Sequence, residues 1–179
     1  MGFVGPIAAG KGTVCAYLKD KHGAQIFRFS TILRDILDRL YLPQSRENMQ
    51  SASSALRQIF GEDLLAQTIA TDVKKSAASI IALDGVRRLA DIKFLQENPD
   101  FHLVEIIAYQ KIRYERLLKR SENSDDQEKS FEEFQKDEQQ ETELQIKEVA
   151  QTAEFQINND GSFDDLYRQI DDILKQVTK

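Results

Sequence analysis

The chain has little of what disulfide, zinc or membrane proteins need. Its single cysteine, Cys15, excludes an internal disulfide, and its two histidines, His22 and His102, are too few and too isolated for a zinc site. No apolar run approaches the roughly 18 residues of a membrane span. The first residues resemble neither a signal peptide nor a transit peptide. These absences favour a globular protein in the reducing cytoplasm, with no membrane partner.

Positive charge is also scarce. Lys and Arg total 24 against 30 Asp and Glu, which gives a net charge of −6. Nucleic-acid binding depends on neutralising phosphates, so this balance argues against a nucleic-acid partner. The acidity is concentrated in residues 121–148, with 11 acidic and 3 basic side chains, while the rest of the chain has 19 acidic and 21 basic. Such a run is typical of a solvated helical face, and it is also a candidate surface for a protein partner.

Strand patterns and helix patterns alternate along the chain. Five strands are predicted, at residues 2–4, 24–29, 79–83, 103–108 and 154–157. The helices between and after them are predicted from Lys11, at 32–37 with Ser30 as N-cap, and at 45–60, 63–75, 89–96, 111–119, two segments up to 149, and 163–177. This alternation predicts an α/β fold, a parallel sheet between two helical layers. A length of 179 residues is most simply one domain.

Residues 5–13, Gly-Pro-Ile-Ala-Ala-Gly-Lys-Gly-Thr, match the phosphate-binding loop with one insertion, because Gly12 separates Lys11 from Thr13. The glycines allow consecutive N–H groups to point at an anion, and the helix that follows adds its positive end. Lys11 supplies charge for the phosphates of ATP, and the Thr13 hydroxyl can hold Mg²⁺. The loop stands between a predicted strand and a predicted helix, as the motif requires. We therefore predict nucleotide contacts at Gly5, Ala8, Ala9, Gly10, Lys11, Gly12, Thr13 and Val14.

Three other polar segments fall at predicted strand ends, where ligands bind in parallel sheets: 30–31, 84–87 and 158–161. Asp84 closes a buried strand and can bind Mg²⁺ through water or an attacking hydroxyl, although Asp-Gly is also common in plain turns. Asn159 is predicted to contact the nucleotide. Arg87 is preferred over Arg88 as a phosphate ligand, with one of the pair free to bridge surface carboxylates.

Further arginines are candidates for the two phosphate groups. Ser30 and Arg34 are predicted to share one side of a helix and to bind an acceptor phosphate, although Ser30 can serve only as a cap. Arg57 is a candidate for the same anion, or a solvated helical arginine. Arg116 and Arg120 recur on one helical face and are predicted to contact the nucleotide during transfer. Pairing with Glu115 or with the acidic run is the alternative.

Taken together, these motifs resemble the P-loop nucleoside monophosphate kinases, with an adenylate-kinase-related group as the nearer likeness and dephospho-coenzyme A and deoxynucleotide kinases as similar layouts. The resemblance implies a five-stranded parallel sheet, an acceptor-binding helical region at about 31–76 and a lid at about 120–140. It implies that Lys11 contacts the donor phosphates, Arg34 and Arg87 the acceptor phosphate, and Arg116 and Arg120 ATP. The lid arginines of adenylate kinases that follow the position of Arg120 are absent here, with Lys136 the one basic stand-in.

The sequence thus predicts a kinase that uses ATP and Mg²⁺ and transfers the γ-phosphoryl group to a nucleotide-like acceptor. The depleted lid and the acidic helices leave a second hypothesis open, an ATP-binding regulator or assembly factor with slow hydrolysis. An adaptor with a vestigial loop is the third.

Overall fold

The computed structural model describes residues 1–119, 127, 129–139 and 141–178. Its five strands form one sheet with the order β2-β3-β1-β4-β5, and every neighbouring pair is parallel. The strands are β1 (Gly2–Val4), β2 (Gln25–Arg28), β3 (Ile81–Asp84), β4 (Leu103–Ile107) and β5 (Phe155–Asn158). The predicted sheet and its five strands are therefore confirmed, with ends shifted by at most two residues, and by only one at the last strand.

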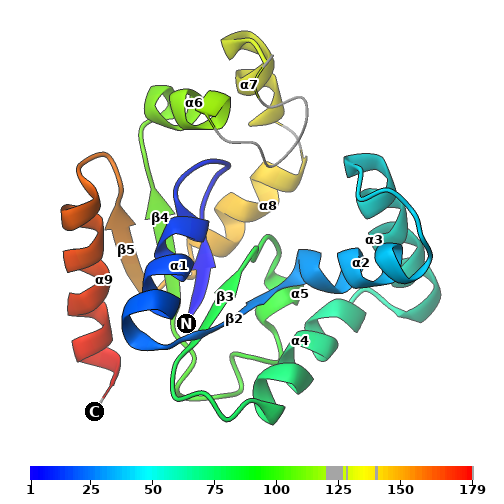
Figure 1. The fold of residues 1–179 in the computed structure, drawn as a ribbon, viewed down its shortest axis with the longest axis horizontal. Helices are drawn as coiled ribbons and strands as arrows, with labels where there is room; N and C mark the ends of the chain where they lie inside the picture. The colour runs from blue at the N-terminus through cyan, green and yellow to red at the C-terminus, as the bar shows by residue number, and fades with distance from the viewer. Residues whose placement is uncertain (120–126, 128, 140, 179) are drawn as a thin grey trace.

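Helices cover both faces of this sheet (Figure 1). They are α1 (Lys11–His22), α2 (Phe29–Arg39), α3 (Arg46–Phe60), α4 (Leu64–Lys75), α5 (Leu89–Ile92), α6 (Gln110–Lys119), α7 (Phe131–Asp137), α8 (Glu141–Ala150) and α9 (Phe163–Val177). Figure 1 shows α9 on one side of the strands and α4 and α5 on the other, with α2 and α3 projecting away and α6 and α7 beyond the carboxyl ends. None of the described helices is long and apolar enough to cross a membrane.

Alternation along the strands divides the core in two. Phe3 on β1 belongs to one buried cluster with α1 and α9, and the next residue, Val4, to another with α2, α4, α5 and α8. Successive strand residues point to opposite faces, so a single strand supplies both clusters. Each fully buried side chain of this size contributes about 1.5–3 kcal/mol by leaving water. The two clusters hold the carboxyl ends of the strands in place.

The helix boundaries follow local signals in most places. Ser45 caps α3 by accepting the N–H of Asn48, and Gly61 ends that helix, as predicted. The N-cap of α2 is Arg28, so the prediction that Ser30 caps this helix is wrong, and Ser30 lies inside its first turn. The helix predicted at 89–96 ends at Ile92, and residues 93–97 form turns instead. The predicted polar break at 121–126 and Arg120 lie outside the described residues.

Candidate functional site

The loop between β1 and α1 approaches its neighbours so closely that two positions require glycine. A β-carbon on Gly5 would stand 2.2 Å from the Ile106 carbonyl oxygen, and one on Gly10 would stand 2.1 Å from Asn159 Nδ2. Both residues also have positive φ, 150° at Gly5 and 109° at Gly10. Gly10 is the N-cap of α1, so the amino end of that helix opens onto the loop. The two glycines thus create the space in which backbone N–H groups can surround an anion.

Ala8 holds a strained conformation at the middle of the loop. Its φ of 58° lies in the left-handed region, which costs a residue with a β-carbon roughly 1–2 kcal/mol. The loop is fixed around it, because Ala9 donates its N–H to the Pro6 carbonyl at 3.2 Å and accepts a bond from Asn159 Nδ2 at 2.7 Å. Ala9 itself is fully buried. Backbone strain of this kind persists only where the surrounding structure fixes the conformation, and it is typical of functional loops.

The Lys11 side chain folds back onto the loop. Its Nζ donates to the Gly5 carbonyl at 2.6 Å and to the Pro6 carbonyl at 2.9 Å. Thr13 is half-buried in the first turn of α1. Val14, predicted to contact the nucleotide, instead lies in the core, and its N–H bonds to the Gly10 carbonyl at 3.1 Å. The Val14 side chain therefore packs in the core, and its contact to the nucleotide stays a prediction.

The neighbouring strand ends bring Asp84 beside an arginine that the sequence analysis did not select. Arg28 and Asp84 are register partners at the carboxyl ends of β2 and β3, and Arg28 Nε lies 3.0 Å from Asp84 Oδ2. The Asp84 side chain is 15% exposed and that of Arg28 is 44% exposed. In the sequence Arg28 is typical of an ordinary strand residue. Its position at the end of a strand, directly before α2, was the one feature that could have indicated a site residue. Asp84 thus lies at the predicted edge, already paired with a cation.

Asn159 and Arg116 meet on the other side of the loop. Asn159 is buried and, besides holding Ala9, accepts a long hydrogen bond of 3.5 Å from Arg116 Nη2. Arg116 Nη1 is buried and has no hydrogen-bond acceptor among the residues that the structure describes. Burial lowers the pKa of Arg116, and nearby Asp160 opposes that shift. A buried donor without an acceptor is costly, so this nitrogen is placed to gain from an arriving anion.

Arg113 is a second arginine that sequence reasoning passed over in favour of its neighbours on α6. Its side chain is 8% exposed. Nε donates to the Ala108 carbonyl at 2.9 Å, Nη1 to the loop carbonyl of Ile7 at 3.3 Å, and Nη2 pairs with Glu138 after α7. A positive charge buried this deeply needs such partners. Arg113 therefore ties α6 and the end of α7 to the phosphate loop.

The arginines predicted to bind an acceptor lie on α2, on α3 and after β3. Arg34 donates to Gln44 Oε1 at 2.6 Å. Arg57, with its side chain 13% exposed, donates to Ser53 and to the Glu62 carbonyl and lies 3.9 Å from Asp91. Arg57 is thus engaged in a structural network, and its acceptor role stays a prediction. Arg87 is exposed, with no hydrogen bond or ion pair from its guanidinium to the described residues.

Asp91 fixes the backbone next to Arg87. Its Oδ2 accepts the N–H groups of Arg87 and Arg88, each at 3.0 Å. Burial raises the pKa of Asp91, and these two bonds and the charge of Arg88 oppose the shift. Arg88 pairs with Glu62 at 3.2 Å, so it is the member of the pair that bridges carboxylates, as one of the two was expected to do. Arg87 remains the member that a ligand can reach.

We expect Asn159→Ala to weaken the loop. The change removes the buried bond to Ala9 and leaves that carbonyl unpaired, which should lower the free energy of unfolding by about 1–3 kcal/mol. Denaturant unfolding would measure the loss, and titration with a fluorescent ATP analogue would show weaker binding. Asn158→Ala is the matched control, because Asn158 is exposed and its side-chain oxygen accepts the N–H of Asp160, two residues further on, and not a bond from the phosphate loop. Equal losses in the two variants would contradict the role given to Asn159.

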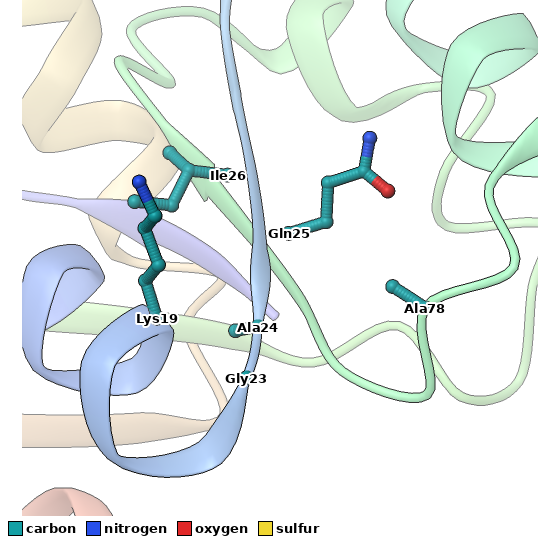
Figure 2. Close-up of a pocket in the computed structure, with 6 residues that line it drawn as sticks. All are labelled: Lys19, Gly23, Ala24, Gln25, Ile26 and Ala78. Carbon is teal, nitrogen blue, oxygen red and sulfur yellow. The ribbon is translucent and has the colours of Figure 1, made fainter.

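One pocket of the described residues lies away from this site. It has a volume of about 600 Å³ and is lined by Lys19, Gly23, Ala24, Gln25, Ile26 and Ala78. Figure 2 shows Lys19 and Ile26 on one side of the edge strand β2 and Gln25 on the other. The lining belongs to the amino end of β2 and contains no predicted site residue. Ligands of open parallel sheets bind at the carboxyl ends, so the loop edge is the better candidate.

Comparison with known proteins finds relatives in sequence and in fold. A UPF0200 protein of Staphylothermus marinus is 28% identical over 171 residues, covering 96% of this chain and 88% of the relative. A UPF0200 protein of Saccharolobus solfataricus is 25% identical over 175 residues, covering 96% and 89%. Among solved structures, shikimate kinase from Bacteroides thetaiotaomicron has a TM-score of 0.67 at 12% identity, covering 99% of this chain and 97% of that one. TT1252 from Thermus thermophilus has 0.64 at 20%, with the same coverage. These structural likenesses are evidence for the fold.

The parallel sheet and the phosphate loop define a protein of the P-loop class with a kinase-like fold. More particularly, the chain belongs to the AAA domain family AAA_17, whose sequence profile matches residues 4–135.

Proposed function

We propose that this protein transfers the γ-phosphoryl group of ATP to a nucleoside monophosphate or a similar small phosphorylated acceptor. The observation that carries the proposal is the loop: Lys11 Nζ stands at its mouth, 2.6 Å and 2.9 Å from two loop carbonyls, with the Arg28–Asp84 pair at the adjoining strand ends. Such charges at the carboxyl edge of a parallel sheet suit phosphoryl transfer, which depends on positioning and on charge stabilisation.

The residues present fit ATP and Mg²⁺. Gly5 and Gly10 keep the loop free of β-carbons, and Arg116 Nη1 is a buried donor with no acceptor among the described residues. The loop N–H groups and Lys11 would hold the phosphates, while the Thr13 hydroxyl and, through water, Asp84 would hold Mg²⁺. The metal supplies neutralisation of the phosphate oxygens. Asn159 would contribute to binding indirectly, because its hydrogen bond to the Ala9 carbonyl holds the loop in place.

The acceptor would lie on the side of α2 and the turn after β3. Arg87, exposed and with its backbone fixed by Asp91, is the first candidate for the acceptor phosphate. Arg34 is the second, and its bond to Gln44 would have to open. Ser30 lies in the first turn of α2, one turn before Arg34.

An acceptor panel tests the proposal. Purified protein with Mg-ATP is offered nucleoside monophosphates, deoxynucleoside monophosphates and dephospho-coenzyme A, and ADP formation is compared with formation of the phosphorylated product. We expect product from at least one acceptor well above background hydrolysis. ADP without any phosphorylated product would contradict the proposal.

The second candidate function is an ATP-binding regulator that hydrolyses ATP slowly. Large apolar side chains exposed after α2 and at the end of α3 favour it, because such residues often mark protein contacts: Leu40, Tyr41, Leu42, Ile59 and Phe60. The acidic segment 121–148 would be a further contact surface. Hydrolysis that a partner protein stimulates, with no acceptor phosphorylated, would favour this function over the kinase.

A further inference from the structure

Arg28 occupies a position where a cation could act on the transferred group. It is the last residue of β2 and the N-cap of α2, the helix that carries Ser30 and Arg34. We infer that Arg28 is a catalytic residue whose guanidinium contacts the γ-phosphoryl group during transfer. This inference rests on the proposed function and assigns a role to a residue outside the predicted site.

Asp84 holds the guanidinium in place. The two residues are paired in register on neighbouring strands, and the ion pair joins Arg28 Nε to Asp84 Oδ2 at 3.0 Å. A carboxylate that engages Nε leaves other N–H groups of the fork for a second anion. The Arg28 side chain is 44% exposed, so a ligand can reach it. Anchoring at one end reduces the entropy that the side chain loses when it binds phosphate.

The Arg28 guanidinium lies beside Gly12 of the loop. Nη2 of Arg28 lies 3.8 Å from the place where a β-carbon on Gly12 would stand, which is van der Waals contact distance. Gly12 is the residue by which the loop departs from the usual order of lysine followed directly by a hydroxyl. The guanidinium is therefore close to the residue that separates Lys11 from Thr13 in the loop.

Three other arginines near the site are less available for this task. Arg113 is tied to two carbonyls and to Glu138, and Arg57 and Arg88 lie in the carboxylate network of Glu62 and Asp91. Residues 121–138 contain no arginine at all. Charge on the equatorial oxygens nevertheless has to be stabilised in the transition state. Arg28 supplies that charge from the strand edge.

The step itself needs no proton transfer. A deprotonated phosphate oxygen of the acceptor attacks the γ-phosphorus with a lone pair and forms a new P–O bond. The bond from the γ-phosphorus to the bridging β-oxygen breaks, and its electron pair stays on ADP. Arg28 would donate hydrogen bonds to the migrating group throughout, most strongly when that group is between the two oxygens.

Arg28→Ala tests the inference, with the acceptor that the panel identifies. We expect kcat to fall on the order of 10²-fold or more, as when other transition-state donors are removed, while the KM for ATP changes only a few-fold. Arg28→Lys should recover part of the loss, and added guanidinium should partly restore Arg28→Ala. Arg39→Ala is the control, since Arg39 is exposed at the far end of α2.

Three results would overturn the inference. One is a kcat for Arg28→Ala within about three-fold of wild type, by the same comparison of transition-state contacts. Another is a loss that neither lysine nor guanidinium lessens, which would mark a structural effect. The last is a wild-type protein that phosphorylates no acceptor; this overturns the proposed function itself, and the wild-type arm shows it before any variant is assayed.

Discussion

Lys11→Ala should abolish phosphoryl transfer and leave the fold intact. Removing a charged contact to the migrating phosphate should lower kcat/KM on the order of 10²–10³-fold or more. The stability should change little, because the Lys11 bonds to the Gly5 and Pro6 carbonyls are local to a half-buried loop. A coupled assay with the best acceptor would measure the first effect, and denaturant unfolding the second.

Lys19→Ala is the matched control for this prediction. Lys19 is on the same helix, exposed, and lines the pocket at the opposite edge of the sheet. Its removal should leave transfer unchanged. Turnover of Lys11→Ala equal to that of Lys19→Ala would refute the assignment of the loop as a catalytic phosphate site.

Gly5→Ala should have the largest effect on stability. Its β-carbon would meet the Ile106 carbonyl at 2.2 Å, and Ile106 is fully buried in β4, so neither backbone can move aside cheaply. We expect the free energy of unfolding to fall by about 3 kcal/mol or more, the range reached when a special backbone position and tight packing are both disturbed. Urea unfolding followed by circular dichroism would measure it, and a variant that cannot fold agrees with the prediction.

Gly23→Ala separates the two causes. Gly23 also has a positive φ, 68°, but a β-carbon there meets nothing within 4 Å. Its loss should therefore be only the conformational cost, roughly 1–2 kcal/mol. If both variants lost the same stability, the close approach of β1 to β4 would not be the reason for glycine at position 5.

The fold could be predicted well because its signals are local. The last helix begins and ends where the sequence indicated, at Phe163 and Val177, because Ser162 and Asp165 form a capping box and the apolar residues recur at helical spacing. The helix after β3 ends at Ile92 and is shorter than predicted. The apolar spacing of residues 89–96 does not indicate where the helix gives way to turns. Ser30 looked like a cap, but the cap of α2 is the strand residue Arg28.

The site could be predicted only in part, because side-chain pairings depend on contacts between distant residues. The loop is a contiguous motif and was recognisable. Arg28 was missed because its partner, Asp84, lies on another strand, and register between strands is not visible in either segment alone. Arg113 was missed for the same reason, since its loop contact, Ile7, is 106 residues away in the sequence.

The most direct measurement of the central claim is a crystal structure of this protein with Mg²⁺ and a non-hydrolysable ATP analogue. We predict the triphosphate on the N–H groups of residues 8–13, with Lys11 Nζ moved from the Gly5 and Pro6 carbonyls to phosphate oxygens. An analogue bound elsewhere, with the loop unchanged and Lys11 still on its two carbonyls at saturating nucleotide, would contradict the account.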